Sequence, residues 1–198
     1  YVMENVLFKI SFPAEFHSQT AVECAMQLHG ELKRLGKKTE DIRKIRIRTH
    51  EAAIRIIDKK GPLDNPADRD HCIQYMVAVP LIFGRLTAGD YEDAMAADPR
   101  IDALRAKIVC VEDKGFTRDY HDPEKRSIAN ALNVEFKDGR KLGEFVCEYP
   151  IGHKRRRKEG MPLLVEKFKT NLARRFPAKQ QKAILDACMD RARLEAMP

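Results

Sequence analysis

Hydrophobic and polar positions recur with two different periods in the first part of the chain. From residue 21 to residue 35 the apolar positions are three or four residues apart, and Gly36 follows the last of them. This spacing predicts an amphipathic helix that ends at the glycine and is capped within residues 18–20. In residues 42–49, isoleucines alternate with arginines, which predicts a strand with one buried and one solvated face. A short helix is predicted for residues 51–58.

Residues 67–86 are apolar at nearly every position, which predicts a helix buried on all sides. Pro80 should kink this helix. A polar turn with several ionisable residues precedes it, and on a helix that begins near Ala67 the side chains of His71 and Tyr75 share one face. A site is therefore expected at this junction. The alternative is a purely structural junction in which Asp68 or Asp70 caps the helix.

The second half of the chain contains three strand-like segments, residues 108–111, 127–136 and 144–149. Asp138 and Gly139 predict a hairpin between the last two. Asp98 is placed to cap a short helix, and two helices at residues 163–175 and 178–197 close the chain. This order of elements predicts an α+β fold in which a mainly antiparallel sheet is covered by helices around a buried central helix. Residues 1–198 are expected to form a single domain.

Charge introduces one alternative function. The net charge is +7, and Lys154 to Lys158 form a continuous basic run. Such a run is typical of a solvated loop, an anion-binding loop or a nucleic-acid contact. The chain also carries 30 acidic residues and only 7% aromatic residues, so a platform on which bases could stack is not apparent.

The five cysteines are widely spaced and include no Cys-x-x-Cys pair, which indicates reduced thiols in an intracellular compartment. The same spacing predicts neither a zinc nor an iron–sulfur site. No apolar run is long enough to span a bilayer, and no leader sequence is apparent. A protein of the cytoplasm, or of the mitochondrial matrix in a eukaryote, is expected.

Several segments of the chain resemble the MmgE/PrpD family. They include the Phe12-Pro13 dipeptide and the residues after it, the Gln74-Tyr75 dipeptide within residues 61–84, and the Gly152-His153 dipeptide within residues 149–168. Further matching segments are residues 4–11, 49–57, 91–93 and 125–132. The resemblance covers nearly the whole chain and implies the C-terminal domain of the family, preceded in its members by a larger helical domain. Because the chain begins at Tyr1 without a methionine, it is expected to be a fragment.

The resemblance implies elimination of water from 2-methylcitrate to give 2-methyl-cis-aconitate, in the methylcitrate cycle of propionate catabolism. Citrate and cis-aconitate are alternative substrates. This chemistry requires a base for a carbon-bound proton, stabilisation of the developing charge and an acid for the departing hydroxyl. In this family it is implied to need no metal or other cofactor. The missing N-terminal domain is expected to supply the general base and half of the pocket, and a homodimer is expected.

Relatives carry a tyrosine in the Gln-Tyr dipeptide and a lysine shortly before the Phe-Pro dipeptide in their active sites. The resemblance therefore implies that Tyr75 donates a proton or hydrogen bond and that Lys9 pairs with a substrate carboxylate. The alternatives are a structural Tyr75 whose hydroxyl meets a backbone carbonyl, and a solvated Lys9. His17, His71 and His153 are expected to contact substrate.

Glu15 stands where relatives that decarboxylate aconitate carry histidine, which favours a dehydratase. His29, His50 and His121 are assigned no chemistry. Two other functional classes stay open. A nucleic-acid-binding module is favoured if the basic run shares one face with Arg43, Arg46 and Arg48, and a non-catalytic dimerisation domain is favoured if the two C-terminal helices expose an apolar patch.

Overall fold

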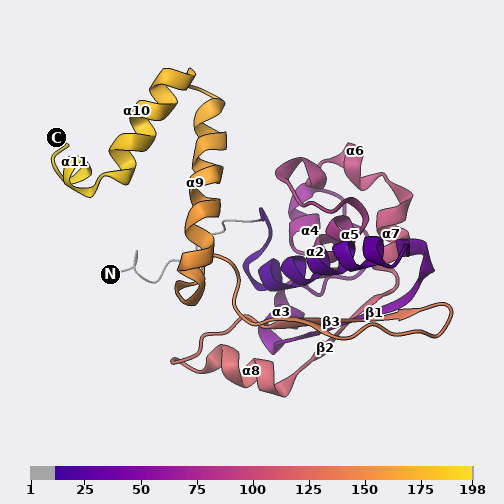
Figure 1. Ribbon diagram of the computed structural model, residues 1–198. Coiled ribbons are helices and arrows are strands. Elements are labelled where there is room, and N and C mark those ends of the chain that lie inside the picture. Colours follow the sequence, from indigo (N-terminus) through magenta and orange to yellow (C-terminus); the bar gives the residue numbers. More distant parts are fainter. Residues whose placement is uncertain (1–11, 198) are drawn as a thin grey trace. The chain divides into compact units, whose positions relative to one another are not determined.

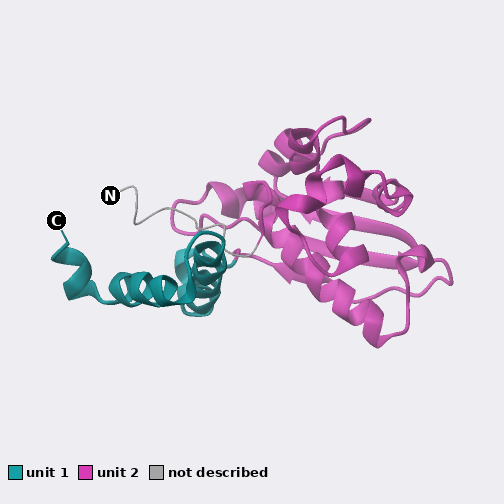
Figure 2. Cartoon of the chain, turned by 90° about the horizontal axis from the view of Figure 1, so that it is seen from above, with its two compact units in different colours: residues 1–11, 151–198 teal, residues 12–150 magenta. Residues whose placement is uncertain are grey.

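The computed structural model of this chain describes residues 12–197 (Figure 1). They divide into two compact units, residues 12–150 and residues 151–197, which Figure 2 distinguishes by colour. Each unit is described by itself below. The expected single domain over residues 1–198 stays a prediction.

The larger unit is organised around a four-stranded sheet with the strand order β2-β1-β3-β4. The strands are β1 (Ile42–Thr49), β2 (Ile108–Glu112), β3 (Asn130–Phe136) and β4 (Phe145–Cys147). β1 pairs in parallel with β2, whereas the β1–β3 and β3–β4 pairs are antiparallel. The predicted α+β fold with a mainly antiparallel sheet is therefore confirmed.

Helices cover one face of this sheet because the alternating side chains of β1 place its isoleucines there. Ile45 and Ile47 are fully buried, while Arg46 between them is exposed. Helices α2 (Gln19–Arg34), α5 (Ile73–Phe83) and α7 (Pro99–Arg105) lie on the same side of the sheet in Figure 1, and α8 (Lys114–His121) lies on the opposite side. Every residue of α5 from Ile73 to Leu81 is buried, which confirms the expected central helix.

Short elements connect these parts of the larger unit. They are η1 (Phe16–Ser18), η2 (Thr39–Asp41), α3 (Glu51–Ile57), α4 (Pro66–Asp70), η3 (Ala88–Tyr91) and α6 (Asp93–Ala96). α3 contacts η1, β2 and α8. It therefore connects the first element of the unit to the helix on the opposite face of the sheet. This arrangement brings residues near positions 17, 50 and 120 together.

The predicted continuous helix over residues 67–86 is wrong. The chain forms α4 and α5 instead, separated at Cys72, whose φ of −122° and ψ of 103° are extended. Asn65 caps α4, because its side chain accepts a hydrogen bond from the Asp68 amide, so neither Asp68 nor Asp70 serves as the N-cap. α5 ends at Gly84, which has a φ of 68° that favours glycine.

Other boundaries also differ from the sequence predictions. The hairpin at Asp138 and Gly139 is confirmed, with Gly139 at a φ of 83°, but β3 begins only at Asn130. Ser18 precedes α2 without accepting a capping hydrogen bond, since its hydroxyl donates to the Glu15 carbonyl at 2.6 Å. α8 has no counterpart among the helices predicted from the sequence.

The smaller unit contains η4 (Lys154–Arg156), α9 (Arg157–Ala173), α10 (Ala178–Met189) and α11 (Arg191–Glu195). The basic run therefore forms a 3-10 turn and the start of α9, and the last predicted helix is divided at Asp190. None of the helices found between residues 12 and 197 is long and apolar enough to cross a membrane.

Candidate functional site

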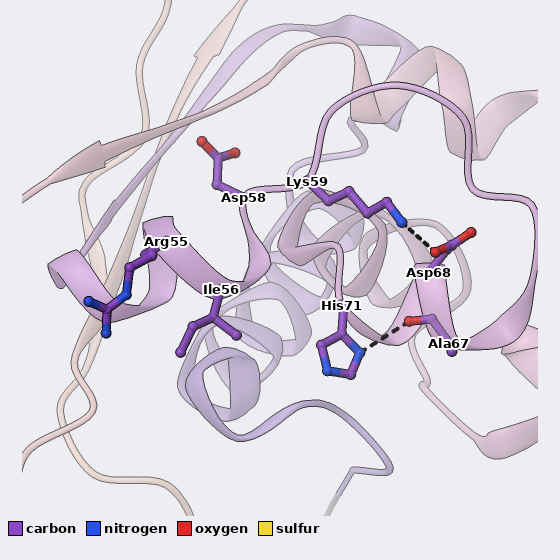
Figure 3. A pocket seen from close by; sticks show the side chains of 7 residues that line it. All are labelled: Arg55, Ile56, Asp58, Lys59, Ala67, Asp68 and His71. Carbon is purple, nitrogen blue, oxygen red and sulfur yellow. Dashed lines mark hydrogen bonds and ion pairs between the residues drawn. The ribbon is translucent and has the colours of Figure 1, made fainter.

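A pocket of about 540 Å³ opens between α3 and α4 (Figure 3). Its lining residues are Arg55, Ile56, Asp58, Lys59, Ala67, Asp68 and His71. We call it the His71 pocket. The Lys59 ammonium forms an ion pair with Asp68, and this hydrogen bond is the main reason that the pKa of Asp68 lies below its usual value. The wall of the pocket thus combines the Lys59–Asp68 ion pair with a second acid, Asp58, and a second cation, Arg55.

His71 is half-exposed at the end of α4, with 52% of its side chain accessible. Its Nδ1 atom lies 3.1 Å from the Ala67 carbonyl and therefore carries the hydrogen of the neutral ring. The Nε2 atom is left as the acceptor, and the ring faces Ile56 in Figure 3. The sequence prediction placed His71 in such a site. The predicted shared helix face with Tyr75 is wrong, because Cys72 breaks the helix between them.

Tyr75 lies inside the core, with 1% of the residue exposed. Its hydroxyl donates a hydrogen bond to the Asp90 carbonyl at 2.6 Å, and burial raises the pKa of Tyr75 to about 12. Asp90 is held by a 2.9 Å ion pair with Arg85 and by the Thr87 amide. This is the geometry that the structural alternative for Tyr75 anticipates. The catalytic role of Tyr75 stays a prediction.

His17 is placed by η1, whose N-cap is Glu15. The Glu15 carboxylate accepts from the His17 amide at 2.7 Å and lies 2.9 Å from the ring Nδ1 atom. On the other side of the ring, Nε2 lies 3.1 Å from the Tyr120 hydroxyl of α8. Both the carboxylate and the imidazole are largely buried, with 13% and 9% of their side chains exposed.

The charge of Glu15 is stabilised despite this burial. Burial alone would raise its pKa, but hydrogen bonds from His17 and the positive charges of His17 and His71 outweigh that effect, so the pKa of Glu15 is lowered. The contribution of His71 is the smallest of these, and the contacts with His17 account for most of the lowering.

His50 completes a compact group of side chains, Glu15, His17, His50 and Tyr120, which we call the His17 cluster. The His50 and Tyr120 rings are stacked with centroids 4.4 Å apart and an angle of 6° between their planes. His50 is fully buried and its Nδ1 atom caps α3 by accepting from the Ala53 amide at 3.4 Å. Burial, followed by the charge of His17, lowers the pKa of His50 to about 4.

The remaining predicted site residues are His153 and Lys9. His153 belongs to the smaller unit, where it is 3% exposed and its Nδ1 atom accepts from the Arg155 amide at 3.2 Å. Burial, together with Arg155 and its basic neighbours, lowers the pKa of His153. Lys9 lies outside the described residues. The predicted substrate contacts of His17, His71 and His153 stay predictions.

Tyr120 and His50 were missed by sequence reasoning, each for an identifiable reason. Tyr120 lies on α8, an amphipathic helix of eight residues that was not among the helices predicted from the sequence, although Phe116 and Tyr120 have the spacing of four that indicates one helix face. His50 directly follows the predicted strand that became β1, and polar residues at that position are a signal that could have drawn attention to it. Between residues 12 and 197, no group of three or more His, Cys, Asp or Glu side chains could hold a metal ion.

The basic residues that would favour a nucleic-acid-binding module are divided between the two units. Arg43 forms an ion pair with Glu135 at 2.8 Å, and Arg48 forms ion pairs with Asp113 and Glu144. Two of the three arginines are therefore partly neutralised. By contrast, the smaller unit exposes several large apolar side chains, namely Met161, Leu163, Met189 and Leu194 on its helices and Phe176 between α9 and α10. An interaction surface on these helices is thus the better supported of the two alternatives.

Comparison with known proteins agrees with this architecture. The family model described as MmgE/PrpD C-terminal domain matches residues 12–191. The whole chain is 74% identical to a 2-methylcitrate dehydratase of Cupriavidus necator and 72% identical to one of Salmonella typhimurium, and it spans 41% of the length of each. A mitochondrial 2-methylcitrate dehydratase of Yarrowia lipolytica is 66% identical over 187 residues, which are 94% of this chain and 36% of that protein. The chain belongs to the MmgE/PrpD family and corresponds to its C-terminal domain.

Proposed function

We propose that this chain is the C-terminal domain of a hydro-lyase that eliminates water from 2-methylcitrate to give 2-methyl-cis-aconitate. The reaction would serve propionate catabolism through the methylcitrate cycle. The observation that carries the proposal is the identity of 71–74% over the whole chain to several proteins named 2-methylcitrate dehydratase. Because the chain spans only 41% of those proteins, the remaining part of the enzyme would complete the active site.

The His71 pocket offers suitable contacts for a tricarboxylate. The Arg55 guanidinium is 71% exposed and lies 3.6 Å from Glu51, so it can also reach a substrate carboxylate. His71 presents Nε2 to the pocket and gains a second donor when it is protonated. Arg55 and Lys59 are the cations of the wall, and each is paired with an acid, Glu51 and Asp68 respectively. Binding of the anion would therefore depend on cations that local acids only partly neutralise.

The remaining site residues have roles in the same proposal. Tyr75 would protonate the leaving hydroxyl, and for this its hydroxyl would exchange the bond to Asp90 for one to substrate. Lys9 would pair with a substrate carboxylate as a compact cation. His17 and His153 would contact substrate. A location in the bacterial cytoplasm, or in the mitochondrial matrix of a eukaryote, is part of the proposal and agrees with the mitochondrial relative.

The experiment is an assay of the full-length protein that contains this domain. Dehydration of 2-methylcitrate is followed by the ultraviolet absorbance of the new conjugated double bond. The substitution His71→Gln should raise KM about tenfold with a smaller change in kcat, because one substrate contact worth about 1.4 kcal/mol is lost. His29→Gln is the matched control, since His29 contacts the Leu81 carbonyl away from the pocket. A wild-type protein that does not dehydrate 2-methylcitrate would overturn the proposal.

A second function of the domain is association. The apolar side chains exposed on α9, α10 and α11 support a role of these helices in contacts with the rest of the enzyme or with a second copy in a homodimer. Sedimentation of the full-length protein would test the dimer. A protein that sediments as a monomer at micromolar concentration would contradict the proposed homodimer.

A further inference from the structure

The hydrogen bonds around His17 have a defined direction. An ionised carboxylate can only accept, so the contact with Glu15 requires the ring hydrogen of His17 to be on Nδ1. In the neutral ring Nε2 is then the acceptor, and the Tyr120 hydroxyl donates to it across 3.1 Å. The three groups are thus arranged so that a proton can move from Tyr120 toward His17 while Glu15 stabilises the resulting imidazolium.

Tyr120 reaches closer to the surface than the two histidines of the His17 cluster. Tyr120 and Glu15 are half-buried, whereas His50 is fully buried and His17 is buried with 7% of the residue exposed. The parallel stack on His50 fixes the plane of the Tyr120 ring. His50 cannot compete as a proton acceptor near neutral pH, because burial has lowered its pKa to about 4. The phenol oxygen of Tyr120 is therefore the atom through which this group can exchange a proton with a ligand.

The surroundings of the His17 cluster also require a polar partner. Four buried polar atoms there have no hydrogen-bond partner among the described residues: Thr49 Oγ1, His50 Nε2, Ser127 Oγ and Asn130 Oδ1. Thr49 is the last residue of β1 and His50 follows it as the N-cap of α3. β3 is antiparallel to β1 and begins at Asn130, whose Nδ2 atom donates to the His17 carbonyl at 2.9 Å. Unsatisfied groups of this kind mark places where polar ligands or ordered water bind.

We propose that Glu15, His17 and Tyr120 form a proton relay in which Tyr120, in place of a residue of the N-terminal domain, is the general base of the dehydration, an inference that rests on the proposed function. As the carbon–hydrogen bond of the substrate breaks, its proton bonds to the Tyr120 oxygen and the phenol proton passes to Nε2 of His17. The electron pair of that bond forms the new carbon–carbon double bond while the carbon–oxygen bond breaks. The hydroxyl leaves as water with a proton from the acid of the reaction, and the relay returns its own proton to solvent through Tyr120.

The groups that face the relay set its pH dependence. Glu15 and His17 come from η1. His50 lies at the start of α3, which also carries Glu51 and Arg55, while α8 contributes Asp119 and His121. The carboxylate of Glu15 is the charge in direct contact with the ring that receives the proton. A protonated Nε2 atom cannot accept the phenol proton, so the relay requires the neutral ring of His17.

The first test is Tyr120→Phe in the full-length protein. This variant keeps the ring that stacks on His50 but lacks the proton-transferring oxygen, so kcat should fall by about 10² to 10⁴ with the melting temperature nearly unchanged. Tyr91→Phe is a matched control, because the Tyr91 hydroxyl is buried without a partner among the described residues. Unaltered kcat in the Tyr120 variant would overturn the relay.

The second test separates a proton-transferring role from a structural one. Tyrosines fluorinated on the ring, inserted at position 120, keep the hydroxyl and its packing but make the phenol more acidic. If Tyr120 transfers the proton, the acidic limb of the pH profile of kcat/KM should move to lower pH as fluorination increases. A profile that does not move would contradict the relay even if Tyr120→Phe were poorly folded.

The two proposals can fail separately. A wild-type protein that does not dehydrate 2-methylcitrate would overturn the proposed function and, with it, the relay as its base. An active wild-type protein whose Tyr120 variants keep the same rate and the same pH profile would overturn the relay alone.

Discussion

At the scale of single residues, the environment of each ionisable group decides its chemistry more than its type does. Tyr75 and Tyr120 are both tyrosines near the predicted site, but the hydroxyl of Tyr75 meets a backbone carbonyl and that of Tyr120 meets an imidazole. Likewise, His50 is fully buried and His71 is half-exposed. Burial penalises a charged ring, so only the exposed histidine is free to pair with an anion.

Tyr75→Phe tests the proposed acid in the full-length protein. Removing the hydroxyl eliminates the bond to Asp90, so the free energy of unfolding should fall by about 1 kcal/mol. If the proposed proton donation is correct, turnover should also fall by about 10² to 10⁴. Urea denaturation and the absorbance assay measure the two effects. A less stable variant with full turnover would leave Tyr75 with a structural role only.

His50 predicts a pH dependence of stability. Its pKa is about 4 in the folded protein against an ordinary value of 6.5, so between these values the unfolded chain binds more protons than the folded one. Stability from this residue is complete above pH 6.5 and is lost as pH falls toward 4, by up to about 3 kcal/mol.

The variant His50→Asn isolates this effect, because asparagine can still cap α3 but does not titrate. Urea denaturation at several pH values should give a shallower fall in unfolding free energy between pH 6.5 and 4 than in the wild type. His121→Asn, at an exposed position on α8, is the control. Parallel curves for wild type and His50→Asn would contradict the prediction.

At the scale of elements, α8 shows how a short helix can be set by its contacts. Asp113 caps it by accepting from the amides of Gly115 at 2.7 Å and Phe116 at 3.0 Å, and the same carboxylate pairs with Arg48 of β1. The Arg48 guanidinium also lies over the Phe116 ring, 5.2 Å from its centroid. These contacts hold α8, the helix that carries Tyr120, against the sheet.

Asp113→Ala should therefore destabilise the larger unit by about 1–2 kcal/mol, since the cap and the ion pair are lost together. Asp113→Asn keeps a capping oxygen and loses only the charge, so it should lower the free energy of unfolding by less than half of this amount. Urea denaturation of both variants gives the comparison. Equal destabilisation by alanine and asparagine would show that Asp113 does not stabilise the unit by capping α8.

At the scale of the whole molecule, the chain corresponds to 41% of its relatives' length, and its proposed activity depends on the rest. Unit by unit, residues 12–150 hold a hydrophobic core, whereas α9 and α10 bury only Gly160, Leu172 and Ala187. Helices with so little buried surface need a partner to contribute stability. The remainder of the proposed enzyme is the partner that we propose.

Residues 1–198 alone should bind tricarboxylates weakly and should not dehydrate 2-methylcitrate measurably. Half of the proposed pocket and its other charges are then missing, so the transition state is not stabilised. The ultraviolet assay with the full-length protein as positive control measures this. Robust turnover by the isolated chain would contradict the proposal of an active site completed by the rest of the enzyme.

The sequence by itself determined the elements whose pattern is local. Four elements could be predicted because side-chain period and turn chemistry depend on neighbouring residues. They are β1 with its alternation, α2 with apolar positions three or four residues apart, the apolar α5 and the hairpin at Gly139. Family membership was also readable, because it rests on residue identities along the chain. The break between α4 and α5 at Cys72 could not be predicted, since a local apolar pattern does not reveal where the backbone becomes extended.

Only the tertiary structure decided which polar residues meet. His17 and Tyr120 are 103 positions apart, and their contact follows from α3 and α8 packing at the end of β1. Tyr75 was singled out by its motif, but the fold turned its hydroxyl to the Asp90 carbonyl. Contacts between distant residues depend on how the elements pack, and burial and pKa depend on those contacts. The pattern along the chain therefore predicted the scaffold, and packing determined which side chains share a site.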